Sequence, residues 1–195
     1  MSFNKIAILD KDGTLVRPKS GAEFVQNPED QELLPGVEEA VARLVEENCR
    51  LAIASNQGGV AAGRKSLLDA VSEMRYCMEL FPYQPDFGDK LPLIDSAYFC
   101  PDFEGKQLYC AEFDFDGFFE FEALHEQLFR IYPLKECRKP GAGMIKEIIS
   151  RHGLDKRDYE RVVMIGDRPE DQGAAEAAGI RFVDAAEWRA GRVQI

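Results

Sequence analysis

Residues 6–14 have the sequence Ile-Ala-Ile-Leu-Asp-Lys-Asp-Gly-Thr, and this stretch decides the fold. Its first part, Ile6–Leu9, predicts a buried strand, because a short continuous apolar run is typical of one. Two carboxylates, Asp10 and Asp12, follow the strand and enter a turn at Gly13. In an open α/β sheet, ligands bind where the strands end. Asp10 and Asp12 are therefore candidates for holding a hard cation and for nucleophilic attack. The alternative is a strand that ends in an ordinary Asp-Gly turn.

Predicted strands and helices alternate along the chain, which favours a parallel sheet with right-handed crossovers. Pro35-Gly36 opens a helix with apolar residues at 37, 41, 44 and 45. Segments 15–17 and 23–26 flank a turn that contains Pro and Gly, and they predict a small hairpin flap over the end of the first strand. Further strands are expected at 51–54, 96–100, 162–165 and 181–183, and further helices at 65–80, at 121–131, at 144–152 and, Ala-rich, up to about 178.

These elements predict one α/β domain, residues 1–195, with a Rossmann-like three-layer parallel sheet. The segment 81–136 is crowded with Pro, Gly, aromatic and acidic residues, and we expect it to be an insert that forms a lid or substrate loop. Its stretch Phe113–Phe121 is expected to provide insert core and solvated acids. A partner surface or the lining of a substrate pocket are the alternatives for that stretch.

Charge and cysteine content exclude some classes of protein. The net charge of −11 argues against a protein whose main task is to grip nucleic acid, because phosphate neutralisation dominates such binding. No apolar run approaches the length of a membrane span, and the N-terminus lacks a signal-peptide pattern. Five cysteines without a secretory signal predict reduced thiols in a cytoplasmic protein.

A hydroxyl follows the second predicted strand. The strand at 51–54 delivers Ser55 to the same sheet edge as Asp10. The hydroxyl, free backbone N–H groups near Gly58-Gly59 and the start of a helix can together cradle an anion. The alternative is an ordinary Gly-rich turn between a strand and a helix.

Two cations, Arg138 and Lys139, stand in a loop that Pro140-Gly141 constrains before a helix. A fixed lysine can neutralise a phosphoryl group and a nucleophilic carboxylate together. A solvated basic pair, common on protein surfaces, is the alternative.

Another carboxylate, Asp167, follows the predicted strand at 162–165, and Asp171 lies four residues further on. Mg²⁺ prefers a few carboxylates together with water and substrate phosphate. Asp10, Asp167 and a backbone carbonyl near Asp12 would suit it. Asp171 fits a supporting role or that of an acidic residue in the first turn of a helix, where the helix dipole favours it.

The pieces occur in a fixed order that resembles the haloacid dehalogenase superfamily of phosphotransferases. The resemblance covers Ile6–Thr14, Ser55–Gly59, Arg138–Met144 and Val162–Asp171. The phrases Ser-Asn-Gln-Gly-Gly and Arg-Lys-Pro-Gly-Ala-Gly-Met are similar to those of the branch that contains histidinol-phosphate phosphatase, heptose-1,7-bisphosphate phosphatase and polynucleotide 3′-phosphatase. The resemblance implies the fold of this superfamily and Mg²⁺-dependent hydrolysis of a phosphomonoester.

The resemblance also implies roles for individual residues. Asp10 attacks phosphorus to form an aspartyl-phosphate, and Asp12 protonates the leaving oxygen and then activates water. Ser55 binds phosphoryl oxygen and Lys139 balances the charge. Mg²⁺ is held by Asp10, Asp167 and the carbonyl of Asp12, with Asp171 in support. The implied substrate- or phosphate-binding residues are Gly13, Thr14, Asn56, Gln57 and Arg138.

Relatives in this branch often carry a zinc loop of Cys and His just before Arg-Lys-Pro. Cys100 and Cys137 stand where loop ligands are expected, but Asp102 replaces a typical His and Lys135 a typical Cys. Cys110 is a further candidate, although its spacing does not make a Cys-x-x-Cys pair. Buried free thiols are therefore favoured over structural zinc at these three cysteines.

For the substrate, the resemblance favours a small phosphorylated metabolite of the sugar-phosphate or histidinol-phosphate type. A second similarity, in Thr14–Val16 and Lys19–Phe24, is to polynucleotide 3′-phosphatases, so a nucleic-acid 3′-phosphate end is the alternative. The acidic insert offers few cations to follow a nucleic-acid backbone, which favours the metabolite. A catalytically weak phosphate-binding or scaffold protein is the alternative of another class, and the intact catalytic pieces argue against it.

Overall fold

A computed structural model describes residues 5–81, 93–94, 96–112, 132–133 and 136–195. Its centre is a seven-stranded sheet in the order β7-β6-β5-β4-β1-β8-β9. Neighbours among β5, β4, β1, β8 and β9 pair in parallel, whereas β6 pairs antiparallel with β5 and β7 pairs antiparallel with β6. The strands are β1 (Lys5–Leu9), β4 (Cys49–Asn56), β5 (Ser96–Cys100), β6 (Gln107–Glu112), β7 (Tyr132–Pro133), β8 (Val162–Gly166) and β9 (Arg181–Asp184).

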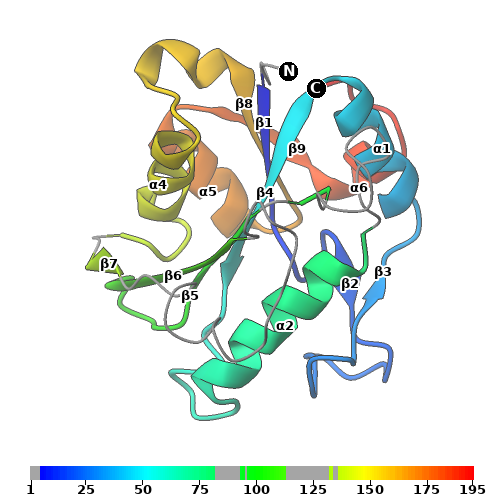
Figure 1. The fold of residues 1–195 in the computed structure, drawn as a ribbon, viewed down its shortest axis with the longest axis vertical. Helices are drawn as coiled ribbons and strands as arrows, with labels where there is room; N and C mark the ends of the chain where they lie inside the picture. Colours follow the sequence, from blue (N-terminus) through cyan, green and yellow to red (C-terminus); the bar gives the residue numbers. More distant parts are fainter. Residues whose placement is uncertain (1–4, 82–92, 95, 113–131, 134–135) are drawn as a thin grey trace.

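Helices cover both faces of the sheet (Figure 1). One face carries α4 (Gly143–Arg151) and α5 (Pro169–Ala178), and the other carries α1 (Val37–Glu46), α2 (Leu67–Glu79) and α6 (Ala185–Arg189). Strand β1 contributes to both cores because successive side chains of a strand point to opposite faces. Ala7 and Leu9 pack with the side of α1, and Ile6 and Ile8 pack with the side of α4. The three-layer α/β architecture is thus confirmed.

Local sequence signals explain where the helices next to the sheet edge begin and end. Helix α2 starts at Ser66, whose hydroxyl accepts a hydrogen bond from the N–H of Asp69 while the Asp69 carboxylate accepts from the N–H of Ser66. Helix α5 starts with Pro169 and ends at Gly179, which has a φ of 77°. A short 3₁₀ helix, η2 (Lys156–Arg161), precedes β8. Most of the predicted strands and helices are present, with ends shifted by a residue or two.

The predicted hairpin flap is wrong in its second strand. Strand β2 (Val16–Arg17) pairs antiparallel with β3 (Glu32–Leu33), and the segment 23–26 belongs to the loop between them. We call residues 18–31 the flap loop.

A single carboxylate explains why the flap loop is irregular. Asp30 accepts hydrogen bonds from the N–H of Ser20 at 2.7 Å, from the hydroxyl of Ser20 at 2.8 Å and from the N–H of Gln26 at 3.0 Å. Because this side chain satisfies the backbone N–H groups of Ser20 and Gln26, these two donors need no partner strand.

The segment 81–136 supplies β5, β6 and β7 to one edge of the sheet. These strands account for the antiparallel pairs that the simple alternation of strands and helices did not predict. The predicted helix at 121–131 and the stretch Phe113–Phe121 lie outside the described residues, so the expected lid or substrate loop stays a prediction. None of the described helices combines the length and the apolar character needed to cross a bilayer.

Candidate active site

The candidate functional side chains gather at the carboxyl ends of three neighbouring strands. Leu9 of β1 is in register with Ile53 of β4 and with Ile165 of β8, so the chain leaves all three strands at the same edge. The N–H of Asp10 continues the pairing and donates to the carbonyl of Ile165 at 2.9 Å. Asp10 therefore follows β1, the middle one of three neighbouring strands. On its two sides, β4 carries Ser55 and β8 leads to Asp167.

A buried cation, Lys139, faces Asp10. Its Nζ donates to Oδ1 of Asp10 at 2.6 Å and to the carbonyl of Ala54 at 2.7 Å, and it lies 2.5 Å from Oδ1 of Asp171. The side chain of Asn56 holds the lysine backbone, because its amide accepts from the N–H of Lys139 at 3.0 Å and donates to its carbonyl at 2.9 Å. One ammonium group thus links the end of β1 to the first turn of α5.

Burial raises the pKa of Asp10 to about 7, because removal from water penalises the charged carboxylate, and nearby Asp171 adds to this effect while Lys139 opposes it. Burial alone would lower the pKa of Lys139. The Asp10 and Asp171 carboxylates outweigh burial, and the pKa of Lys139 is raised. Lys139 is consequently charged at neutral pH. Its single positive charge faces two carboxylates, those of Asp10 and Asp171, and so cannot neutralise both.

The carboxylates of Asp10, Asp167 and Asp171 form a candidate metal centre, in which one oxygen atom of each lies within 4.8 Å of the other two. Burial, with a contribution from Asp171, also raises the pKa of Asp167. Clustered carboxylate oxygens fit Mg²⁺, whose charge would offset their mutual repulsion. Asp171 is already engaged, since Oδ1 lies against Lys139 and Oδ2 accepts the N–H of Arg168 at 3.1 Å. Asp10 and Asp167 therefore fit as ligands and Asp171 fits as their support.

Two glycines allow these carboxylates to approach the backbone. Gly13 has a φ of 89°, and a Cβ there would lie 2.3 Å from Oδ2 of Asp167. A Cβ at Gly166 would lie 2.4 Å from the carboxylate of Asp171. The hydroxyl of Thr14, which is buried, donates to Oδ1 of Asp167 at 3.3 Å. In this structure Gly13 and Thr14 thus border the candidate metal centre.

Asp12 lies beside this cluster with both carboxylate oxygens hydrogen-bonded. Nζ of Lys11 donates to Oδ1 at 2.6 Å, and Nε2 of Gln57 donates to Oδ2 at 3.0 Å and to Oγ of Ser55 at 2.9 Å. Burial opposes the charged form, but Lys11 and then Lys65 outweigh it, and the pKa of Asp12 is lowered. Its side chain is 40 % exposed, so one side of the carboxylate remains open to a ligand.

Arg138 lies at the margin of the site. Its guanidinium stands 5.3 Å from the ring centre of Phe103, and Nη1 is 3.5 Å from the carbonyl of Asp102. The structure therefore brings Asp10, Asp12, Ser55, Gln57 and Lys139 into one cluster and leaves Arg138 at the rim.

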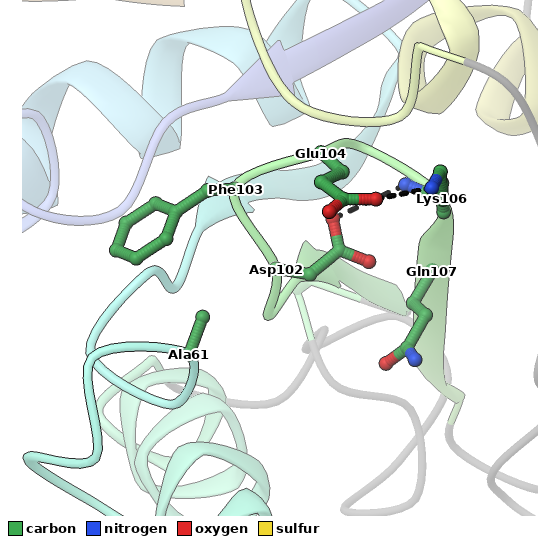
Figure 2. A pocket seen from close by; sticks show the side chains of 6 residues that line it. All are labelled: Ala61, Asp102, Phe103, Glu104, Lys106 and Gln107. Atoms are coloured by element: carbon green, nitrogen blue, oxygen red, sulfur yellow. Dashed lines mark hydrogen bonds and ion pairs between the residues drawn. The ribbon is translucent and has the colours of Figure 1, made fainter.

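A depression of about 340 Å³ opens next to this rim on the loop between β5 and β6. Figure 2 shows Phe103 extending from that loop, while Glu104 and Lys106 form an ion pair. Phe103 reaches back toward the site, because a Cβ at Gly58 would lie 2.8 Å from its ring. The depression is lined by Ala61, Asp102, Phe103, Glu104, Lys106 and Gln107.

The three cysteines of the suspected zinc loop are buried free thiols. Within the described part of the chain, the groups of three possible metal ligands include no cysteine. The thiol of Cys100 instead donates to the carbonyl of Asp102 at 3.4 Å. Burial raises the pKa of Cys100 to about 12 and that of Cys137 to about 11, which disfavours the thiolates that zinc requires. Cys110 is buried as well, and Lys135 lies outside the described residues.

Several residues around the site were not predicted from the sequence. Nζ of Lys11 is fully buried and also donates to Oε1 of Gln31 at 2.9 Å. Lys65 donates to the buried carboxylate of Glu73, and Arg189 donates to the carbonyls of Gly13 and Thr14. Glu73 had a detectable signal, because it stands on the buried stripe of α2 among Ala70, Met74, Cys77 and Met78.

Comparison with known proteins identifies the family of the chain. The model of the family described as "Polynucleotide kinase 3 phosphatase" matches residues 5–178. The chain belongs to this family. Membership of this family makes the chain a phosphatase of the haloacid dehalogenase superfamily, as the resemblance implied.

Named relatives of this phosphatase are sugar bisphosphate phosphatases. The D-glycero-β-D-manno-heptose-1,7-bisphosphate 7-phosphatase of Vibrio cholerae is 30 % identical over 175 residues, which cover 88 % of this chain and 75 % of the relative. The enzyme of the same name from Haemophilus ducreyi is 28 % identical over 178 residues, which cover 91 % of this chain and 80 % of the relative.

Among solved structures, the D,D-heptose 1,7-bisphosphate phosphatase of Bordetella bronchiseptica, complexed with magnesium and phosphate, superposes with a TM-score of 0.62 at 21 % identity. The superposition covers 98 % of this phosphatase and 88 % of the other chain. At this identity the likeness supports the fold.

Proposed function

We propose that this phosphatase hydrolyses the phosphomonoester of a small phosphorylated sugar, with Mg²⁺ as cofactor and Asp10 as nucleophile. The observation that carries the proposal is the assembly of Asp10, Lys139, Asp167 and Asp171 at one sheet edge. Phosphoryl transfer needs positioning and charge stabilisation above all, and this assembly supplies both.

In the first step, an Oδ atom of Asp10 bonds to phosphorus while the bond from phosphorus to the leaving oxygen breaks. Asp12 takes up a proton when the phosphate dianion binds beside it, because this like charge raises its pKa. It then gives that proton to the leaving oxygen, which keeps the electron pair of the broken bond. In the second step, Asp12 takes a proton from water as the water oxygen bonds to phosphorus, and the bond between Asp10 and phosphorus breaks. The products are inorganic phosphate and the free alcohol.

Other groups of the chain balance charge and fix the phosphoryl oxygens. Lys139 stays charged beside Asp10 and offsets the negative charge that the phosphate brings. Ser55 and the backbone N–H of Asn56 would bind phosphoryl oxygens. Mg²⁺ held by Asp10, Asp167 and the Asp12 carbonyl, with Asp171 in support, would supply Lewis-acid stabilisation of the phosphoryl charge.

The sugar substrate rests on the relatives, which are phosphatases of heptose-1,7-bisphosphates. A second candidate substrate is the 3′-phosphate end of a polynucleotide, which the family model favours. Two exposed aromatic rings, each with a nearby guanidinium, also suit a nucleobase: Arg64 lies 5.5 Å from the ring centre of Phe24, and Arg138 lies near Phe103. We further propose a cytoplasmic location, in keeping with five free cysteines.

The test is phosphate release from a panel of phosphomonoesters with and without Mg²⁺. The panel contains heptose-1,7-bisphosphates, hexose phosphates, histidinol phosphate and a 3′-phosphorylated oligonucleotide. We expect Mg²⁺-dependent release, fastest with a sugar phosphate and abolished in Asp10→Asn. Asp155→Asn, the same change at an exposed position of the 3₁₀ helix cap, is the matched control and should retain activity.

Each outcome decides one part of the proposal. Faster release from the oligonucleotide than from any sugar phosphate would transfer the proposal to the polynucleotide substrate. Activity of Asp10→Asn close to that of the unchanged protein would overturn the nucleophile, and release without Mg²⁺ would overturn the cofactor.

A further inference from the structure

Five side chains form a closed ring behind Asp12. Lys11 donates to Oδ1 of Asp12 and lies 3.9 Å from Oε2 of Glu73. Nζ of Lys65 lies 2.5 Å from Oε2 of Glu73 and 2.7 Å from its Oε1. Lys65 also donates to Oε1 of Gln57 at 3.0 Å, and Gln57 closes the ring by its hydrogen bond to Oδ2 of Asp12.

Charges alternate around this ring and cancel. Two ammonium groups, from Lys11 and Lys65, alternate with two carboxylates, from Asp12 and Glu73, and Gln57 is neutral. The side chain of Lys11 is fully buried and that of Glu73 is 2 % exposed. Buried charges are retained only when paired, so these groups hold one another in place.

The ring is anchored to the body of the fold through Glu73. This residue lies in the second turn of α2. Gln31 at the end of the flap loop adds a second tie, since it accepts from Lys11 and donates to the Glu73 carbonyl at 3.1 Å. Within the part of the chain that the structure describes, the Glu73 carboxylate pairs with Lys11 and Lys65 and forms no hydrogen bond or ion pair with Asp10 or Asp167.

We propose that Glu73 is a positioning residue that orients Asp12 for proton transfer to and from the leaving oxygen and water. This inference rests on the proposed function of Asp12. With Oδ1 fixed by Lys11 and Oδ2 fixed by Gln57, the carboxylate has one orientation, and its side chain stays 40 % exposed. Each oxygen retains a second lone pair for the reacting atom.

Loss of the Glu73 charge would disturb both arms of the ring. Asp12 would then be the only carboxylate of the ring for both Lys11 and Lys65. The hydrogen bond from Lys65 to Gln57 would be altered as well. Asp12 would be drawn toward the ammonium groups and away from the leaving oxygen. Small displacements of a reacting group lower the rate strongly, because proton transfer requires hydrogen-bond contact.

The test exploits the chemistry of the leaving group. An alkyl phosphate, such as a sugar phosphate, leaves as a strongly basic oxygen and needs the proton of Asp12. Nitrophenyl phosphate leaves as a weakly basic phenolate that needs little protonation. The ratio kcat/KM covers the steps through formation of the aspartyl-phosphate for both substrates, so it isolates this proton transfer.

We expect Glu73→Gln to lower kcat/KM for the alkyl phosphate by about 100-fold. For nitrophenyl phosphate, we expect kcat/KM to fall by no more than about tenfold. The matched control is Glu79→Gln, the same change on the same helix at a half-exposed glutamate that pairs with Arg75. Its two kcat/KM values should stay within about twofold of the unchanged protein. A loss in Glu73→Gln that is equal for both substrates, or no loss, would overturn the proposal.

Asp12→Asn separates this proposal from the function on which it rests. If Asp12→Asn discriminates between the two leaving groups and Glu73→Gln does not, the positioning role fails and the function of Asp12 stands. If Asp12→Asn shows no discrimination, the assignment of Asp12 as the general acid fails, and the positioning role fails with it.

A second variant covers the case in which Glu73→Gln does not fold. Lys65→Gln removes the ring cation that is 18 % exposed and leaves Glu73 paired with Lys11. We expect the same direction of discrimination, with a loss of about tenfold or more confined to the alkyl phosphate. Equal kcat/KM losses for the two substrates in this variant would also contradict the ring.

Discussion

Replacement of the buried lysine, Lys139→Met, has consequences whose size follows from the structure. Its ammonium lies 2.5–2.7 Å from three oxygens, those of Asp10, Asp171 and the Ala54 carbonyl, and its side chain is 2 % exposed. Removal of one partner from a buried ion pair costs about 3–5 kcal/mol, because the remaining charge stays out of water. At about pH 8 without Mg²⁺, we expect the free energy of unfolding to fall by about 3–5 kcal/mol.

The loss should depend on pH, with a sign set by Asp10. The pKa of Asp10 is already raised by burial to about 7 from an ordinary value of 3.8, and removal of Lys139 raises it further. The folded variant therefore binds a proton that the unfolded chain has released above about pH 4, and its stability falls as the pH rises through this range. The destabilisation should thus be smaller at about pH 5 than at about pH 8.

Urea unfolding followed by circular dichroism measures these free energies. In thermal unfolding, the same loss corresponds to a Tm that is lower by roughly 6–20 °C for a chain of this length. Lys146→Met, which removes an exposed lysine from α4, is the matched control and should change stability by less than about 0.5 kcal/mol. The reasoning is refuted if Lys139→Met is no less stable than the control, or if its loss is greater at the acidic pH.

Three further predictions concern the chemistry of the site. Asp12→Asn should lower kcat for a sugar phosphate by about 10²- to 10⁴-fold. With nitrophenyl phosphate, whose transfer to Asp10 needs little protonation, acid-quenched samples of this variant should show a larger phosphorylated fraction than the unchanged protein. An unchanged kcat for the sugar phosphate would contradict the role of Asp12. Because a Mg²⁺ ion bound to Asp10 must displace a proton below about pH 7, its apparent Kd should fall by about fivefold from about pH 6 to about pH 7. Calorimetry measures this Kd, and a Kd independent of pH would contradict the prediction. Gly13→Ala should weaken Mg²⁺ binding by about tenfold or more, because its Cβ would collide with Asp167. Gly63→Ala, which has a similar positive φ but open space around it, should leave that Kd unchanged.

The sequence predicts the edge at which the site forms because parallel strands share a direction. Asp10, Ser55 and Asp167 each follow an apolar run, and the strands that carry them are neighbours in the sheet. Periodicity identifies the strands, and the rule that ligands bind at their carboxyl ends brings the three side chains together. Lys139 needed the resemblance, since a basic pair in a loop has no local signal of burial.

Other features depend on contacts between distant segments, which no local pattern contains. Strands β2 and β3 are two residues long, too short for an alternating pattern, and the carboxylate of Asp30 decides the path between them. Lys11 is buried because Gln31 and Glu73, far along the chain, receive its ammonium. Only the position of Glu73 on the apolar stripe of α2 marked it as an unusual glutamate.

The most direct test of the central claim is chemical identification of the phosphorylated residue. The protein is mixed with Mg²⁺ and a substrate that it hydrolyses, quenched in acid, and treated with borohydride, which reduces an acyl phosphate but leaves free carboxylates intact. Peptide mass spectrometry then locates the reduced side chain. We expect reduction at Asp10 alone, dependent on substrate and, with nitrophenyl phosphate, enhanced in Asp12→Asn. Phosphate release with no reduction at Asp10, or with a phosphorylated Ser55, would contradict it.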